Sequence, residues 1–264
     1  MIPSPIAKQP RARLASNSSK QDPRLFVGTS GWLYKEWAGV FYADALKKGT
    51  ELEYYATRFP TVEINATFYR LPLRSTTRGW YERTPQSFIF AVKGSRYITH
   101  MKRLKATRAS VHRFFSRIDP LGEKCGPILW QLPPTLTVDT KRLDDFLSKL
   151  PAGHHYAVEV RHISWYEEEG TFEILRKHRV AHVAVSSLRL PKNLQVTAPF
   201  AYLRFHGLKD GPRHDYTRAE LQPWAEHARR CLSKGIAVYA YFNNDLNTRA
   251  PWNAELFARM IRGR

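Results

Sequence analysis

Eight short apolar stretches recur along this chain at intervals that leave room for a helix between most of them. The stretches cover residues 25–32, 61–69, 88–94, 127–132, 157–162, 180–187, 201–207 and 236–243. Helical spacing of apolar residues appears in 50–59, 75–83, 107–118, 139–150, 171–178, 217–233 and 254–261, whereas 188–199 predicts a long connection without a helix. Strands that alternate with helices form parallel sheets, and a set of eight is typical of a (β/α)₈ TIM barrel.

The alternative to a barrel is an open, doubly wound sheet. That fold binds dinucleotides through a Gly-x-Gly-x-x-Gly turn after its first strand, and no such motif follows the first stretch here. Polar residues on the expected inward faces also suit a closed barrel. We therefore predict an α/β single-domain barrel over residues 25–264, preceded at 1–24 by a disordered basic tail that lacks the apolar region of a secretory signal.

Composition limits the classes of partner. The chain has 264 residues, of which 43% are hydrophobic, enough for a substantial core, and no apolar run approaches the roughly 20 residues of a membrane span. Cys125 and Cys231 are far apart and lack metal-ligand spacing, which favours a reducing cytoplasm over a disulfide scaffold or a zinc site. The net charge of +19 favours anionic partners, including nucleic acid.

Charged residues alternate with apolar ones in the fifth stretch. Val158 and Val160 fall on one face of the expected strand, and Glu159 and Arg161 fall on the other. When the aliphatic face of every strand is packed against the helices, a polar set points into the barrel. It contains Glu63, Asn65, Lys93, Gln131, Glu159, Arg161, Ser186, Arg204, His206 and Asn243, with Asp245 just beyond the last strand.

This inward set has two interpretations. Most of its members lie near the C-terminal ends of their strands, where barrel enzymes place their sites, so a ligand pocket is our prediction. The alternative is a buried network of ion pairs that fills the barrel, for example Glu159 with Arg204 and Glu63 with Arg161.

Five ordered blocks resemble a known family. They are EINATFY at 63–69, GPILWQLPP at 126–134, VEVRHISW at 158–165, RFHG at 204–207 and YFNND at 241–245. These blocks are similar to the signature blocks of the YecE-like family, a domain of unknown function with a TIM-barrel fold. The resemblance runs from about Leu25 to the C-terminus and implies the barrel, but no established activity.

The chemistry of the inward set favours an anionic ligand, because guanidinium groups match carboxylate and phosphate oxygens. We predict Glu159 or Glu63 as a general base and His206 as a general acid. The predicted ligand-binding residues are Asn65, Tyr69, Lys93, Gln131, Arg161, Trp165, Arg204, Asn243 and Asp245. The neighbouring cations would repel a metal ion, so we predict neither a metal nor a cofactor.

Two other functions remain open at this level. Glu63 and Glu159 are a candidate carboxylate pair for a carbohydrate-active hydrolase, with Tyr69 and Trp165 among the aromatics that would stack on sugars. A non-catalytic nucleic-acid or polyanion binder would instead use the basic segment after the third strand. That segment carries Lys93, Arg96, Lys102, Arg103, Lys105, Arg108, Arg113 and Arg117, interleaved with Tyr97, His100 and Phe114.

Overall fold

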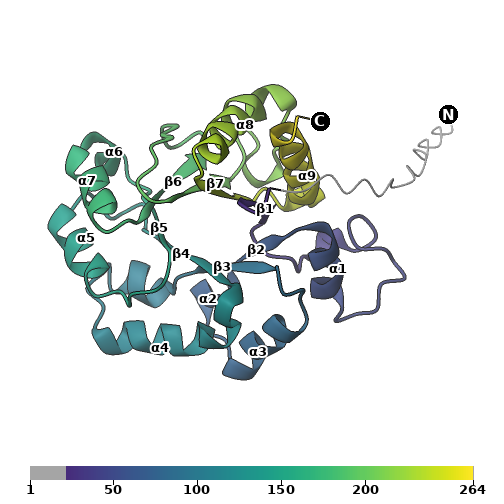
Figure 1. The fold of residues 1–264 in the computed structure, drawn as a ribbon, viewed down its shortest axis with the longest axis horizontal. Helices are drawn as coiled ribbons and strands as arrows, with labels where there is room; N and C mark the ends of the chain where they lie inside the picture. The colour runs from purple at the N-terminus through teal and green to yellow at the C-terminus, as the bar shows by residue number, and fades with distance from the viewer. Residues whose placement is uncertain (1–21, 264) are drawn as a thin grey trace, which may run out of the picture.

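The computed structural model describes residues 22–263, which form a barrel of parallel strands surrounded by helices (Figure 1). The eight strands of the described chain are β1 (Leu25–Thr29), β2 (Thr61–Ile64), β3 (Ile89–Lys93), β4 (Cys125–Gln131), β5 (Tyr156–Glu159), β6 (Ala181–Ser186), β7 (Phe200–Phe205) and β8 (Ala237–Phe242). Each strand pairs in parallel with the next along the chain from β2 to β8, and β8 pairs with β1. A parallel bridge between Ser30 and Glu63 joins β1 to β2, so the barrel is nearly closed.

The helices lie on the outside of this ring of strands (Figure 1). They are α1 (Glu51–Arg58), α2 (Ala66–Tyr69), α3 (Arg74–Glu82), α4 (Arg108–Ile118), α5 (Thr140–Leu147), α6 (Ser164–Glu167), α7 (Glu169–Lys177), α8 (Arg218–Ser233) and α9 (Arg249–Ile261). The connection between β6 and β7 has no helix, as predicted. None of the helices in residues 22–263 combines the length and the apolar character that crossing a membrane requires.

Two apolar layers explain why the sequence alternates. Val158 and Val160 belong to the layer between strands and helices, and each of the other seven strands also contributes outward-facing residues to this layer. A second cluster fills the inside of the barrel, where Tyr202, Tyr239 and Tyr241 are buried. Because successive side chains of a strand point to opposite faces, one strand supplies both layers. The polar ends of the inward faces then lie above the inner cluster, at the C-terminal mouth.

The structure confirms the predicted barrel and corrects it in detail. The apolar alternation of 61–69 predicted one long strand, but β2 ends at Ile64 and the next residues form α2. Ser186 was predicted to face inward, yet its hydroxyl lies 2.8 Å from the hydroxyl of Tyr216, which packs in the outer layer. Alternation does not fix where a strand ends, because apolar residues in a stretch of only four, as in α2, cannot be assigned to strand or helix by periodicity alone.

The predicted tail lies almost entirely outside the described residues. Its last three residues, 22–24, form a turn in which Arg24 pairs with Asp22 at 2.9 Å, and the Leu25 amide donates to the Asp22 carbonyl at 3.0 Å.

Candidate functional site

Five of the predicted site residues are brought together by the C-terminal ends of β2, β3, β4, β5 and β7. Glu63, Lys93, Gln131 and Glu159 lie at or next to the ends of β2, β3, β4 and β5, and Arg204 lies near the end of β7. Each has the parity that points into the barrel. Because parallel strands end at the same rim, residues far apart in the sequence meet there.

Arg204 is the centre of this group and is 1% exposed. Its guanidinium donates to both oxygens of Glu63, at 3.0 and 2.7 Å, and to Glu159. The remaining acceptor positions of Glu63 are taken by hydroxyl donors, Tyr202 at 2.7 Å and Ser30 at 2.7 Å. A buried guanidinium between two buried carboxylates is tolerated because every charge is paired and hydrogen-bonded. The predicted pair of Glu159 with Arg204 is confirmed.

Glu159 is completely buried, and its oxygens accept from further donors, Gln131 at 2.9 Å and Arg161 at 2.6 Å. Arg161 thus pairs with Glu159 and not, as the network interpretation had it, with Glu63. Burial by itself raises the pKa of Glu159, but the positive charges of Arg204 and Arg161 hold it well below its ordinary value. Such a carboxylate is a weak base. In this arrangement Glu159 is a counterion that positions two guanidinium groups.

Glu63 behaves in the same way. Burial opposes its ionisation, yet the charge and hydrogen bonds of Arg204 lower its pKa. A glycosidase pair needs one carboxyl with a raised pKa to act as the acid. Neither Glu63 nor Glu159 has that property here, which argues against a carbohydrate-active hydrolase built on these two groups.

His206 follows β7 and lies between the guanidinium groups. Its Nε2 is 3.0 Å from Nη2 of Arg161 and 3.2 Å from Nη1 of Arg204. Guanidinium nitrogens only donate, so Nε2 accepts and carries no proton. Nδ1 then carries the proton of the neutral ring. It lies 3.2 Å from the amide nitrogen of Asn243, and a half-turn of that amide presents its oxygen to Nδ1.

The neutral state of His206 agrees with its electrostatics. Burial lowers its pKa, and Arg204 lowers it further, against the opposing effect of Glu159, whose Oε1 is 3.4 Å away. His206 was predicted as a general acid. In the free protein it is an unprotonated base, and it becomes an acid only after a bound anion offsets the neighbouring cations.

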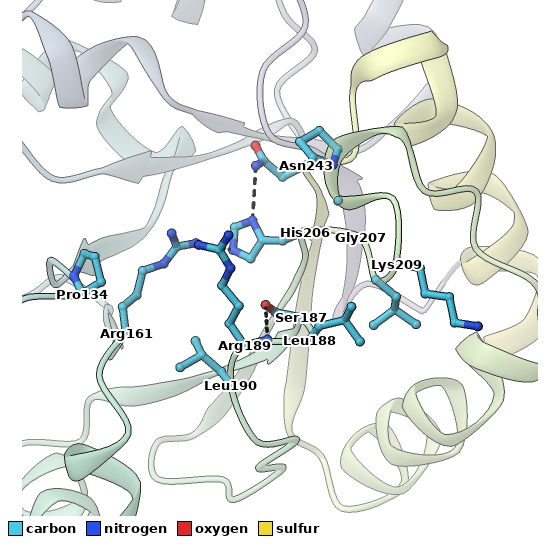
Figure 2. A pocket seen from close by; sticks show the side chains of 13 residues that line it. Pro134, Arg161, Ser187, Leu188, Arg189, Leu190, His206, Gly207, Lys209 and Asn243 are labelled. Carbon is cyan, nitrogen blue, oxygen red and sulfur yellow. Dashed lines mark hydrogen bonds between the residues drawn. The ribbon is translucent and has the colours of Figure 1, made fainter.

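A pocket of about 550 Å³ opens beside His206 at the mouth of the barrel (Figure 2). Its lining residues are Pro134, Arg161, Ser187, Leu188, Arg189, Leu190, His206, Gly207, Leu208, Lys209, Gly211, Pro212 and Asn243. Figure 2 shows the side chains of Arg161 and Arg189 extending toward the same region, next to the His206 ring. Arg189 and Lys209 were not among the predicted site residues, because neither lies on a strand. The sequence feature that could have indicated Arg189 is the long connection without a helix between β6 and β7.

Lys93 lies at the end of β3 with the inward parity of Ile89 and Ala91 and is 8% exposed. Its ammonium is 4.2 Å from the centre of the Phe68 ring. Burial lowers the pKa of Lys93 to about 8, and the charge of Arg204 contributes to that shift. Its amine forms neither an ion pair nor a hydrogen bond with any residue from 22 to 263.

Two predicted ligand-binding aromatics lie outside this group. Trp165 is 1% exposed in the outer core, where its Nε1 donates to the Leu136 carbonyl at 2.7 Å. Tyr69 is 77% exposed at the end of α2. Both residues lie in the sequence blocks that resemble the family. Membership of such a block does not show whether a side chain packs in the core, as Trp165 does, or lines the mouth.

Asn65 and Asp245 lie at the β1 side of the mouth. Asn65 donates to the Ser30 carbonyl at 3.3 Å, and Tyr34 donates to the same carbonyl. Burial raises the pKa of Asp245 to about 8, with the Glu63 charge acting in the same direction. Asp245 is therefore protonated near neutral pH. Within residues 22–263 no group of three or more His, Cys, Asp or Glu is arranged to hold a metal ion.

Comparison with known proteins assigns the barrel to a family. The family described as "Protein of unknown function DUF72" matches residues 26–264. The chain belongs to this family. The DUF72 domain thus accounts for the whole barrel, and the predicted YecE-like family is confirmed.

Two curated relatives are similar to this DUF72 chain. The UPF0759 protein YecE of Escherichia coli K12 is 33% identical over 151 residues, which are 56% of this chain and 53% of that protein. The chain thus spans about half the length of the YecE relatives that it matches. The UPF0759 protein YunF of Bacillus subtilis is 22% identical over 273 residues, covering 90% of this chain and 94% of that protein.

Solved structures confirm the barrel. A DUF72 family protein from Thermotoga maritima is 30% identical with a TM-score of 0.81, covering 90% of this chain and 99% of that one. A DUF72 family protein from Enterococcus faecalis is 18% identical with a TM-score of 0.79, covering 90% and 95% of the two chains. At 18% identity, the similarity to the Enterococcus faecalis protein shows a shared fold and nothing more.

Proposed function

We propose that this protein binds a small anionic ligand, a phosphate ester or a carboxylate, in the pocket beside His206. The observation that carries the proposal is an excess of cations at the mouth. Glu63 and Glu159 are both occupied by Arg204 and their other donors. Arg189 in the pocket and Lys93 at the end of β3 are therefore without a carboxylate partner in the described chain. Unpaired cations at the mouth are matched by an anion.

Acid–base chemistry is the second part of this proposal. A bound anion offsets the charges of Arg161 and Arg189 and raises the pKa of His206, since an opposite charge favours the protonated ring. The ligand therefore supplies the condition under which His206 accepts a proton. Asn243 holds the other ring nitrogen and keeps the ring oriented.

Isothermal titration calorimetry with sulfate and with phosphorylated metabolites tests the anion site. We expect Arg189→Ala to weaken binding about 10- to 100-fold, since a charge-assisted hydrogen bond contributes about 1.5–3 kcal/mol. Lys141→Ala is the matched control, because its side chain is 88% exposed on α5 and lies outside the pocket. Equal affinities in the wild type and both variants would refute the proposed site.

The basic surface favours a second candidate, a binder of nucleic acid or another polyanion. Tyr97 and Met101, both in the helical turn after β3, are 42% and 68% exposed, and the Lys102 ammonium is 5.5 Å from the Tyr97 ring. Exposed aromatics beside cations suit single-stranded nucleic acid. Binding of a labelled oligonucleotide must then fall steeply with salt and weaken in Tyr97→Ala. Salt-independent binding would exclude this candidate.

We further propose a cytoplasmic location. It is supported by Cys125 and Cys231, which are both free thiols rather than a disulfide.

A further inference from the structure

Lys93 differs from the other cations of the mouth in what surrounds it. Arg204 and Arg161 each have carboxylate partners, whereas the Lys93 amine faces the ring of Phe68 at 4.2 Å. His100 packs edge-on against that same ring, with centroids 4.9 Å apart, so the amine sits beside an aromatic wall. Lys93 is 8% exposed and is the last residue of β3, which places it at the C-terminal rim of the barrel.

The groups that act electrostatically on Lys93 come from several strands. Glu63 and Glu159 attract its charge, and Arg204 and Arg161 repel it. Because both carboxylates are already engaged by guanidinium groups, the balance at Lys93 favours the neutral amine more than at an exposed lysine. Burial and the Arg204 charge lower the pKa of Lys93 to about 8, so a larger fraction is unprotonated near neutral pH. A desolvated lysine beside another cation is how proteins prepare an amine nucleophile.

We propose that Lys93 is a nucleophile that forms an imine with the carbonyl carbon of an anionic aldehyde or ketone held at the mouth of the barrel. The inference rests on the proposed function, because the anionic group of the ligand is the part that Arg161 and Arg189 would hold. It narrows the ligand class to small carbonyl compounds that carry a phosphate or a carboxylate.

The step balances without an oxidant or a reductant. The lone pair of the Lys93 nitrogen forms a bond to the carbonyl carbon, and the carbonyl π pair moves to oxygen, which takes up a proton released by the same nitrogen, so that the nitrogen regains its lone pair. The resulting hydroxyl accepts a second proton and leaves as water, while the nitrogen lone pair forms the C=N bond. Overall, one amine, one carbonyl and one proton yield one protonated imine and one water.

Reduction traps the adduct. The purified protein is incubated at pH 7.5 with dihydroxyacetone phosphate or with pyruvate and treated with sodium borohydride, and its peptides are analysed by mass spectrometry. We expect a reduced adduct on the Lys93 peptide in at least tenfold excess over that on Lys141, an exposed lysine of α5. An excess of sulfate must suppress the Lys93 adduct, since it competes for the anion site.

The variants Lys93→Arg and Lys93→Met must abolish this adduct, and their unfolding curves show whether they remain folded. Because the wild type alone is decisive, a variant that fails to fold does not weaken the test. An unmodified Lys93 peptide with both probes, or equal labelling of Lys93 and Lys141, would overturn the inference. Calorimetry with sulfate separates the two proposals. If the wild type binds sulfate but forms no adduct, the imine is refuted and the anion site is not. If the wild type does not bind sulfate, the anion site is refuted together with the imine that rests on it.

Discussion

Replacing Arg204 by methionine removes the cation between two buried carboxylates. The change breaks two hydrogen bonds to Glu63, at 3.0 and 2.7 Å, and one to Glu159, and both carboxylates are 0% exposed. Removing one partner of a buried ion pair costs about 3–5 kcal/mol, because the remaining charge is left unpaired. We expect Arg204→Met to lose at least that much stability. At about 2–4 °C per kcal/mol for a chain of this size, the melting temperature falls by about 6–20 °C.

The loss also has a definite pH dependence. In the wild type the pKa values of Glu63 and Glu159 are lowered, so their contribution is present above about pH 4.3 and is lost as pH falls through the lowered folded values. Without Arg204, Glu63 has no guanidinium partner and burial raises its pKa above that of the unfolded chain, whereas Arg161 still pairs with Glu159. The variant therefore becomes less stable relative to the wild type as pH rises from about 5 to 7.5.

Urea unfolding followed by circular dichroism at pH 5 and pH 7.5 measures both effects. Arg83→Met is the matched control, because Arg83 forms a surface pair with Glu53 at 2.6 Å and we expect a loss of at most about 1 kcal/mol. Combining Arg204→Met with Glu63→Gln and Glu159→Gln must cost less than Arg204→Met alone, since neither buried carboxylate charge remains. A loss below about 1 kcal/mol, or one independent of pH, would refute the reasoning.

Three further predictions concern the mouth and the outer core. Sulfate binding should be coupled to proton uptake by two groups, because the anion raises both of their pKa values: Lys93 near pH 8, and His206 at lower pH, since burial and the Arg204 charge lower its pKa. Calorimetry in buffers of different ionisation enthalpy measures this, and uptake in the lower pH range that persists in His206→Gln would contradict it. Trp165→Phe should cost about 1–3 kcal/mol in urea unfolding by leaving the Leu136 carbonyl unpaired, with unchanged sulfate affinity; altered affinity would place Trp165 in the site. Gly207→Ala should destabilise the protein by at least about 1 kcal/mol and weaken sulfate binding. The reason is that φ of Gly207 is +88° and the new Cβ would lie 1.7 Å from the Gly211 carbonyl oxygen of the same loop. A free energy of unfolding equal to that of the wild type would contradict this.

The inward face of the barrel was predictable because strand alternation is a local property. Glu159 and Arg161 differ by two positions and therefore share a face wherever the strand lies. The same rule correctly placed Glu63, Lys93 and Arg204 inside the barrel. The alternation failed beyond Ile64, where the next apolar residues belong to the helix α2.

The pairing of these groups was not predictable from the sequence. Arg204 contacts both Glu63 and Glu159, and Arg161 contacts Glu159, because the stagger of the strands sets the height of each residue in the barrel. Alternation gives the direction of a side chain but not its height. The pocket likewise depends on Arg189, whose connection has no regular pattern to place it.

The sequence by itself determined the family through the resemblance of five ordered blocks, and it determined the eight-stranded barrel and the cationic character of the inward set through local periodicity and residue type. Only the tertiary structure decided what each charge does. Closing the barrel makes Glu63 and Glu159 counterions of Arg204 and leaves Lys93 and Arg189 without carboxylate partners in the described chain. The physical reason is that a charge acquires its pKa and its role from neighbours that the fold brings from distant strands.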